Sequence, residues 1–244
     1  MSTLRNLRQA TEATPEDVGA LTGLLAHDLR NPLAAMLSNL SFMSAEVDSL
    51  NDELREVFED LLLSVESMTR ITDSLEVFGR EMSAAPVELP QAVSASSVVD
   101  AILPQAKRAA GSHGVTLMTA WDSVAQREIR AVEPHASRAL SALLHNSIAL
   151  SPSRGEVLFQ ARADAQQIVF SILDSGPILS TEIAPRAFSA LEQVGLKTNP
   201  EGRYSRGLGL YVAGASARAA GGELRALTVG DRNAFELSFR SASS

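Results

Sequence analysis

The chain has 244 residues, of which 45% are hydrophobic, and a formal net charge of −8 at pH 7. This composition supports one large or two small folded domains, and the acidic balance argues against a general nucleic-acid binder. There is no cysteine, hence no disulfide framework, and no apolar run approaches the ~20 residues of a membrane span. Because the start also lacks an apolar signal core, we expect a cytoplasmic protein without membrane insertion.

Residues 1–14 are polar and are interpreted as a lead-in to a long helix. Thr14 is the predicted N-cap, Pro15 takes the first helical position, and the pattern continues to about Leu50. At about 100° per residue the apolar side chains fall on one arc. The members of this arc are Val18, Leu21, Leu25, Leu29, Leu33, Met36 and Leu40.

His27 falls almost opposite the centre of this apolar arc, and Asn31 lies one turn further along on the same outward face. Asp28 stands directly beside the histidine in the sequence. An imidazole that a rigid helix holds away from the core, next to a carboxylate, is available for chemistry in water. The pattern therefore makes this turn a candidate reaction site.

A turn at Asn51-Asp52 precedes a second predicted helix, whose apolar spacings alternate between three and four residues, as in a coiled-coil seam. Its stripe comprises Leu54, Phe58, Leu61, Val65, Met68, Ile71 or Thr72, Leu75 and Phe78. Two helices joined by a short turn form an antiparallel hairpin, which alone cannot enclose stripes of this length. We therefore expect residues 15–83 to form half of a dimeric four-helix bundle. An intramolecular coiled coil packed on the rest of the chain is the alternative.

Prolines and small residues over 84–95 indicate a linker, and residues 96–244 then alternate helices with strands. The predicted helices cover 97–111, 134–150 and 207–220, and the predicted strands cover 115–120, 127–132, 156–163, 167–173, 223–229 and 234–239. Residues 180–205 lack periodicity and are long for a loop, which is typical of a functional lid or a disordered segment. The fold class is therefore α+β: a helical hairpin followed by an α/β sandwich with a mostly antiparallel sheet.

The segment His27-Asp28-Leu29-Arg30-Asn31-Pro32-Leu33 closely resembles the phospho-acceptor box of two-component sensor histidine kinases. That box reads His, acid, Leu, Arg, Thr or Asn, Pro, Leu. The resemblance implies that His27 accepts a phosphoryl group, with Asp28 as general base. It also implies transfer to an aspartate of a response-regulator receiver domain, with Asn31 positioning the water that dephosphorylates this partner. A purely structural helix gains nothing obvious from Pro32, which costs about 3 kcal/mol or more in a helix interior.

Three further segments resemble the ATP-binding domain of the same family, whose fold is shared with gyrase, Hsp90 and MutL. Residues 139–147 look like the N box, which implies that Asn146 coordinates the magnesium ion bridging the ATP phosphates. Asp174-Ser175-Gly176-Pro177 looks like the first glycine box, in which the Asp174 carboxylate would accept a hydrogen bond from the adenine amino group. Phe188 stands where the family has its F-box phenylalanine.

The segment Arg206-Gly207-Leu208-Gly209-Leu210 looks like the second glycine box. The resemblance makes Gly176, Arg206, Gly207 and Gly209 candidate nucleotide-binding residues. Glycines at such a position let the backbone approach phosphates, and the helix that follows presents its positive N-terminus to them.

The nucleotide half departs from the family pattern at several positions. Ala142 replaces the first N-box asparagine, and Ala149 stands where Lys or Arg is common. Ile178 and Ser205 replace glycines, and Leu191 replaces the second F-box phenylalanine. The acceptor half thus matches completely, while the nucleotide half is partly degenerate.

We expect a histidine kinase core that uses ATP and magnesium to phosphorylate His27 and then transfers the phosphoryl group to a response regulator. One alternative is a histidine phosphotransferase or degenerate kinase that relays phosphate without using ATP. The other is a non-enzymatic dimeric scaffold. ATP binding separates the first hypothesis from both alternatives, and a phosphoryl group on His27 separates the enzymes from the scaffold.

Overall fold

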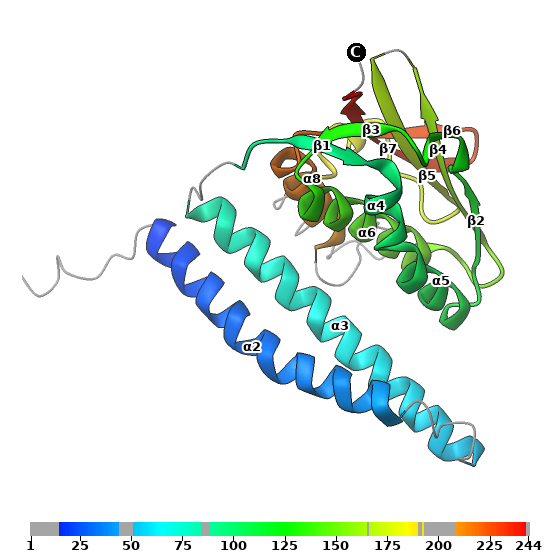
Figure 1. Ribbon diagram of the computed structural model, residues 1–244. Helices are drawn as coiled ribbons and strands as arrows, with labels where there is room; N and C mark the ends of the chain where they lie inside the picture. Colours follow the sequence, from blue (N-terminus) through cyan, green and yellow to red (C-terminus); the bar gives the residue numbers. More distant parts are fainter. Residues whose placement is uncertain are drawn as a thin grey trace, which may run out of the picture. The chain divides into compact units, whose positions relative to one another are not determined.

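A computed structural model of the chain describes residues 15–43, 51–83, 88–164, 166–189, 192 and 208–242. The chain divides into two units, residues 1–86 and 87–244. The first is a helical hairpin, and the second combines helices with β-sheets (Figure 1). This confirms the predicted α+β class.

The hairpin consists of α2 (Pro15–Met43) and α3 (Asp52–Met82). Asn51 caps α3, because its side-chain oxygen accepts a hydrogen bond of 2.9 Å from the backbone N–H of Leu54. The predicted lead-in at 1–14 and the predicted end of the first helix at 44–50 lie outside the described residues. Neither α2, α3 nor any other helix in the described part of the chain combines the length and apolar character that crossing a membrane requires.

The two helices pack along a seam of buried residues spaced seven apart, which is the repeat of a coiled-coil position. The seam contains Gly19, Ala26 and Leu33 on α2, and Phe58, Val65, Thr72 and Gly79 on α3. At Gly19 and Gly79 the helix backbones touch: a Cβ built on Gly79 would lie 2.8 Å from the carbonyl oxygen of Gly19. Small residues therefore fix the closest approach of the hairpin.

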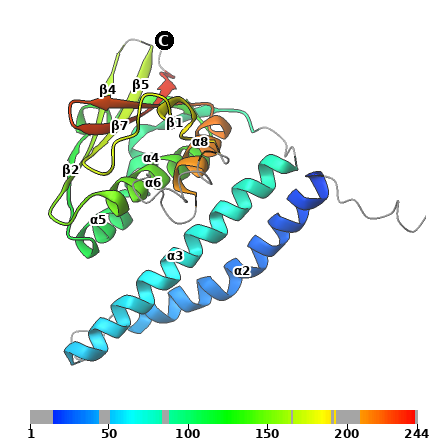
Figure 2. The same cartoon turned by 180° about the vertical axis from the view of Figure 1, so that it is seen from behind.

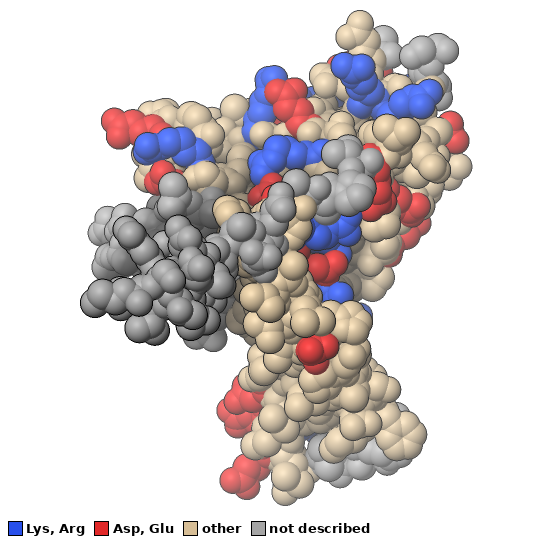
Figure 3. Space-filling view, turned by 90° about the vertical axis from the view of Figure 1, so that its left-hand side faces the viewer, with Lys and Arg blue, Asp and Glu red and all other residues tan. Residues whose placement is uncertain are grey.

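A second apolar seam of the hairpin is exposed in the single chain. Its members are Val18, Leu25, Leu29 and Met36 on α2, and Leu54, Leu61, Met68 and Ile71 on α3. In Figure 3 the hairpin forms the lower part of the view, and its surface is largely uncharged with acidic residues along its left edge. Each stripe predicted as one continuous surface is therefore divided, since part of it closes the hairpin and part of it remains uncovered.

The second unit is built on a five-stranded sheet with strand order β2-β4-β5-β7-β6. The bounds are β2 Thr116–Ala120, β4 Glu156–Ala163, β5 Gln167–Asp174, β7 Arg232–Arg240 and β6 Glu223–Val229. Only the pairing of β2 with β4 is parallel within this sheet, which confirms a mostly antiparallel arrangement. A two-stranded sheet joins β1 (Gln91–Ser94) to β3 (Glu128–Ala131).

Helices cover one face of the five-stranded sheet (Figures 1 and 2). They are α4 (Ala95–Asp100), α5 (Leu103–Ser112), α6 (Glu133–Leu150) and α8 (Gly209–Ala219). Short 3-10 turns occur at η2 (Asp122–Val124) and η3 (Ala184–Arg186). Between helices and sheet lies a core in which Phe159 and Phe170 stack at 6.2 Å and Phe239 meets Phe170 edge-on.

Two predicted boundaries differ from the structure. The helix predicted over 97–111 is divided into α4 and α5. Pro104 stands in the first turn of α5, where it cannot donate to the carbonyl of Asp100, so one continuous helix was the wrong prediction. The linker predicted over 84–95 contains β1, in which Val93 stands opposite Ile129 of β3. Residues 84–87 lie outside the described residues.

Candidate active site

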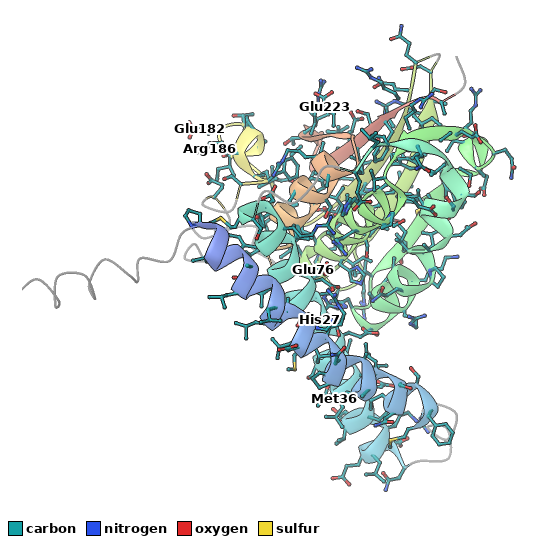
Figure 4. The ribbon with its side chains drawn as sticks, turned by 60° about the vertical axis from the view of Figure 1, so that its left-hand side comes forward. His27, Met36, Glu76, Glu182, Arg186 and Glu223 are labelled. Atoms are coloured by element: carbon teal, nitrogen blue, oxygen red, sulfur yellow. The ribbon has the colours of Figure 1, made fainter. Side chains whose placement is uncertain are left out.

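His27 lies on α2 with its side chain 67% exposed, and its ring Nδ1 is 3.4 Å from Oδ1 of Asp28 (Figure 4). The Asp28 side chain is 65% exposed. The helical periodicity predicted this exposure, because it places His27 opposite the apolar arc that includes Val18, Leu25 and Met36. An exposed ring whose one nitrogen faces a carboxylate presents its other nitrogen, Nε2, to an approaching reactant.

Asn31 is also exposed on α2, one turn beyond His27. The helix continues through Pro32. Because proline has no N–H, it cannot donate to the carbonyl of Asp28, four residues earlier. The backbone next to the candidate acceptor therefore lacks one standard helical hydrogen bond.

Arg30 joins the acceptor turn to the neighbouring helix. Its Nη2 donates to Oδ1 of Asp73 at 3.1 Å and to the carboxylate of Glu76, both on α3. The hydrogen bond that Arg30 donates to Glu76 is the largest effect that raises the pKa of Arg30 above its ordinary value. In the sequence this arginine stood out only as one position of the phospho-acceptor box. Because its two partners lie 43 and 46 residues further along the chain, no local sequence pattern identifies them.

The predicted nucleotide residues of the second unit lie on elements that adjoin. Asn146 is buried on α6 with 1% exposure, and Asp174 is fully buried at the end of β5. Because α6 packs against both α8 and β5, the helix bearing Asn146 contacts the elements bearing Gly209 and Asp174. Arg206 and Gly207 lie outside the described residues.

The Asp174 carboxylate is held by two donors on the same oxygen. Oδ1 accepts the backbone N–H of Gly176 at 2.9 Å and the side-chain Nδ2 of Asn233 at 3.1 Å. Asn233 is fully buried on β7, directly opposite Asp174 in the β5–β7 pairing. The sequence did not identify this asparagine, because only the strand register brings it to the site.

The start of α8 has the backbone shape of an anion-binding turn. Leu208 is in the left-handed region (φ 55°, ψ 41°), and helical residues follow from Gly209. A left-handed residue beside a right-handed one directs successive N–H groups into one concavity, and the helix N-terminus adds a positive dipole end. The conformation costs a non-glycine residue about 1–2 kcal/mol, and such strain concentrates at binding sites.

The departures from the family pattern occupy different environments. Ala142 is half-buried and packs on the core, whereas Ala149 is exposed. Ile178 has 48% of its surface exposed in the loop after Asp174. Ser205 and Leu191 lie outside the described residues.

Phe188, at the F-box position, packs onto the core from the loop after η3. Its ring meets that of Phe235 edge-on at 6.3 Å. A Cβ built on Gly214 of α8 would lie 2.7 Å from the Phe188 Cβ, so this glycine lets the loop approach the helix. The predicted F-box residue thus ties the loop to α8 and β7.

The donor set for a metal ion is sparse in the described residues, which contain no cluster of three or more His, Cys, Asp or Glu. Magnesium typically keeps several waters and takes its other ligands from substrate phosphates and one or two protein oxygens. A single amide oxygen from the buried Asn146 therefore fits a magnesium ion carried by a nucleotide triphosphate.

An exposed histidine beside a carboxylate, on a helical hairpin that an α/β domain follows, is the arrangement of a two-domain phosphotransfer protein. Residues 18–83 match the His Kinase A (phospho-acceptor) domain. Residues 131–242 match the family of histidine kinase-, DNA gyrase B-, and HSP90-like ATPases. The chain therefore belongs to the sensor histidine kinases. His Kinase A domains in general dimerise and exchange phosphoryl groups with response regulators.

Solved structures share the fold at low sequence identity. Full-length ShkA in complex with AMPPNP matches with a TM-score of 0.58 and 21% identity, over 95% of this chain and 47% of ShkA. The Acinetobacter baumannii histidine kinase AdeS matches with a TM-score of 0.55 and 19% identity, over 89% of this chain and 98% of that chain. The chain thus spans about half the length of ShkA. Among curated proteins, none matches the sequence.

Proposed function

We propose that this chain is a histidine kinase core that phosphorylates His27 with ATP and transfers the phosphoryl group to an aspartate of a response regulator. The observation that carries the proposal is the exposed His27–Asp28 pair on a chain whose second unit has a buried Asp174 at the end of β5 and a left-handed residue, Leu208, at the start of α8. The His27–Asp28 pair supplies the nucleophile of the proposed reaction, and the second unit supplies its nucleotide-binding site.

The position of Asp28 supports different roles for the two ring nitrogens of His27. Since Asp28 faces Nδ1, Nε2 is the nucleophile that attacks the γ-phosphorus of ATP. The bond between the γ-phosphorus and its bridging oxygen breaks, ADP leaves, and the proton on Nδ1 passes to the Asp28 carboxylate. Phosphoryl transfer asks little covalent chemistry of the protein beyond positioning and charge stabilisation. Asn146 would hold the magnesium ion, which would neutralise negative charge on the phosphates.

The direct test is incubation with γ-labelled ATP and magnesium, followed by acid or base treatment of the labelled protein. We expect label that is lost in acid and survives base, which is the behaviour of phosphohistidine. Protein that takes label from a phosphorylated receiver domain, but none from ATP, would instead establish the phosphotransferase alternative.

ATP binding is expected to be weak. Asp174 remains, but Ala142 and Ala149 each lack a polar contact that the family has. The loss of a hydrogen bond to a charged group costs about 1.5–3 kcal/mol, or roughly tenfold to a hundredfold in affinity. Starting from a micromolar site, several such losses bring the dissociation constant to about a millimolar. Calorimetry should show this value, with Asp174→Asn removing the remaining heat. Submicromolar binding would mean that these departures are harmless.

Asn31→Ala is expected to leave phosphorylation of His27 intact but to slow dephosphorylation of a receiver partner. The Asn31 amide lies exposed one turn from His27, where it can orient a water molecule. Loss of a positioned group in such a step costs on the order of a hundredfold in rate. Asn39→Ala changes another exposed asparagine of α2 and serves as the control. Equal receiver half-lives for both variants would contradict the assignment.

We also propose that the exposed seam of the hairpin closes a homodimer through residues 15–83. Light scattering should give twice the chain mass of 25.9 kDa. Leu25→Glu places a charge on the seam and should shift the protein to monomers. Leu24 is the matched control, because it is 58% exposed against 60% for Leu25 but lies on the His27 side of α2. Leu24→Glu should remain dimeric, and a monomeric wild type would refute the proposal.

A further inference from the structure

Asn233 connects three successive parts of the loop that follows β5. Its Nδ2 donates to Oδ1 of Asp174 at 3.1 Å, to the carbonyl of Gly176 at 3.2 Å and to the carbonyl of Pro177 at 3.1 Å. Its Oδ1 accepts the backbone N–H of Leu179 at 2.9 Å. One fully buried side chain thus makes four hydrogen bonds to the segment from Asp174 to Leu179.

The contacts fix the orientation of the Asn233 amide. Three oxygen atoms surround one end and an N–H donor faces the other, so exchanging its nitrogen and oxygen would place oxygen against oxygen. Buried polar groups are costly when unpaired, which holds the loop from Gly176 to Leu179 against β7. The Asp174 carboxylate cannot rotate without losing both donors on its Oδ1.

We propose that Asn233 is a positioning residue for base selection: it holds the Asp174 carboxylate and the adjoining loop in the geometry that accepts a purine with a 6-amino group. The inference rests on the proposed role of Asp174 as the acceptor for the adenine amino group. A carboxylate in a fixed position accepts that N–H but repels the carbonyl oxygen that hypoxanthine carries at the same place. Base preference therefore requires the carboxylate to be immobile as well as present.

The test compares the affinities for MgATP and for the magnesium complex of inosine triphosphate by NMR titration, which measures dissociation constants of a millimolar and above. Asn233→Leu keeps the number and branching of the side-chain heavy atoms and removes all four hydrogen bonds. We expect ATP affinity to fall about tenfold or more, with the inosine nucleotide affected less, so that the preference shrinks toward unity. Ser238→Ala changes another residue of β7. It removes a 3.4 Å hydrogen bond to the Glu223 carbonyl on β6 and should leave the preference unchanged.

A second readout needs no nucleotide. The Leu179 amide should lose hydrogen-exchange protection in Asn233→Leu, because its acceptor is gone. If Leu179 loses protection while the ATP preference stays at the wild-type value, Asn233 is only structural and the proposal is overturned. Should Asn233→Leu fail to fold, Asn233→Ser is measured with the same two expected outcomes.

The result also separates this inference from the proposed function. If wild type does not prefer ATP, or if Asp174→Asn leaves the preference intact, the adenine role of Asp174 fails. If Asp174→Asn removes the preference but the Asn233 variants retain it, only the inference about Asn233 fails.

Discussion

His27→Gln is expected to abolish phosphorylation of the chain, whether the donor is ATP or a phosphorylated receiver domain. Glutamine has no nucleophilic ring nitrogen, and no other histidine offers the same surroundings. His135 is buried, and the ring Nδ1 of His113 and of His145 each contacts the carbonyl four residues earlier at 2.9 Å. Only His27 combines an outward helical face with a neighbouring carboxylate.

The matched control is His113→Gln, which changes another exposed histidine and should retain wild-type labelling. Both variants should keep the helical circular-dichroism signal and the mass of the wild type, since neither ring lies in a packing seam. Label retained by His27→Gln would move the acceptor to another residue and would also remove the proposed role of Asp28.

Local signals in the sequence sufficed for much of the fold. The bounds of β4 and β6 agree with the prediction, because alternating apolar residues ended at strong turn residues. At the β4–β5 turn, Asp164 accepts the backbone N–H groups of Gln166 and Gln167 at 2.8 Å. These hydrogen bonds hold the pKa of the Asp164 carboxyl below its ordinary value. Such information is local, and a sequence displays it directly.

Features that depend on distant residues were not predictable in the same way. Periodicity shows that Leu61 and Val65 are both apolar positions of α3, but not that Val65 closes the hairpin while Leu61 stays exposed. Which partner covers a stripe is decided by the register between helices. The register between β5 and β7 likewise brings Asn233 to Asp174, 59 residues apart.

Replacing Gly79, in the hairpin seam, is expected to destabilise the packing of α2 against α3. A Cβ at this position would lie 2.8 Å from the carbonyl oxygen of Gly19 and 2.9 Å from the backbone nitrogen of Gly23. Both obstacles are backbone atoms, so the helices themselves must separate. Overpacking of this kind costs about 1–3 kcal/mol, and Gly79→Leu should cost more than Gly79→Ala because more atoms must be accommodated.

Gly23→Ala provides the matched control, because a Cβ built on Gly23 meets nothing within 4 Å. Both substitutions replace a helical glycine by alanine, and each gains about 0.5–1 kcal/mol of helix propensity. Gly23→Ala should therefore stabilise α2, whereas Gly79→Ala should destabilise the hairpin in spite of the same gain. Amide hydrogen exchange over α2 and α3 measures the difference in the full chain, at one protein concentration because dimerisation contributes to stability. Equal protection in the two variants would show that the close approach at Gly19 and Gly79 does not constrain the hairpin.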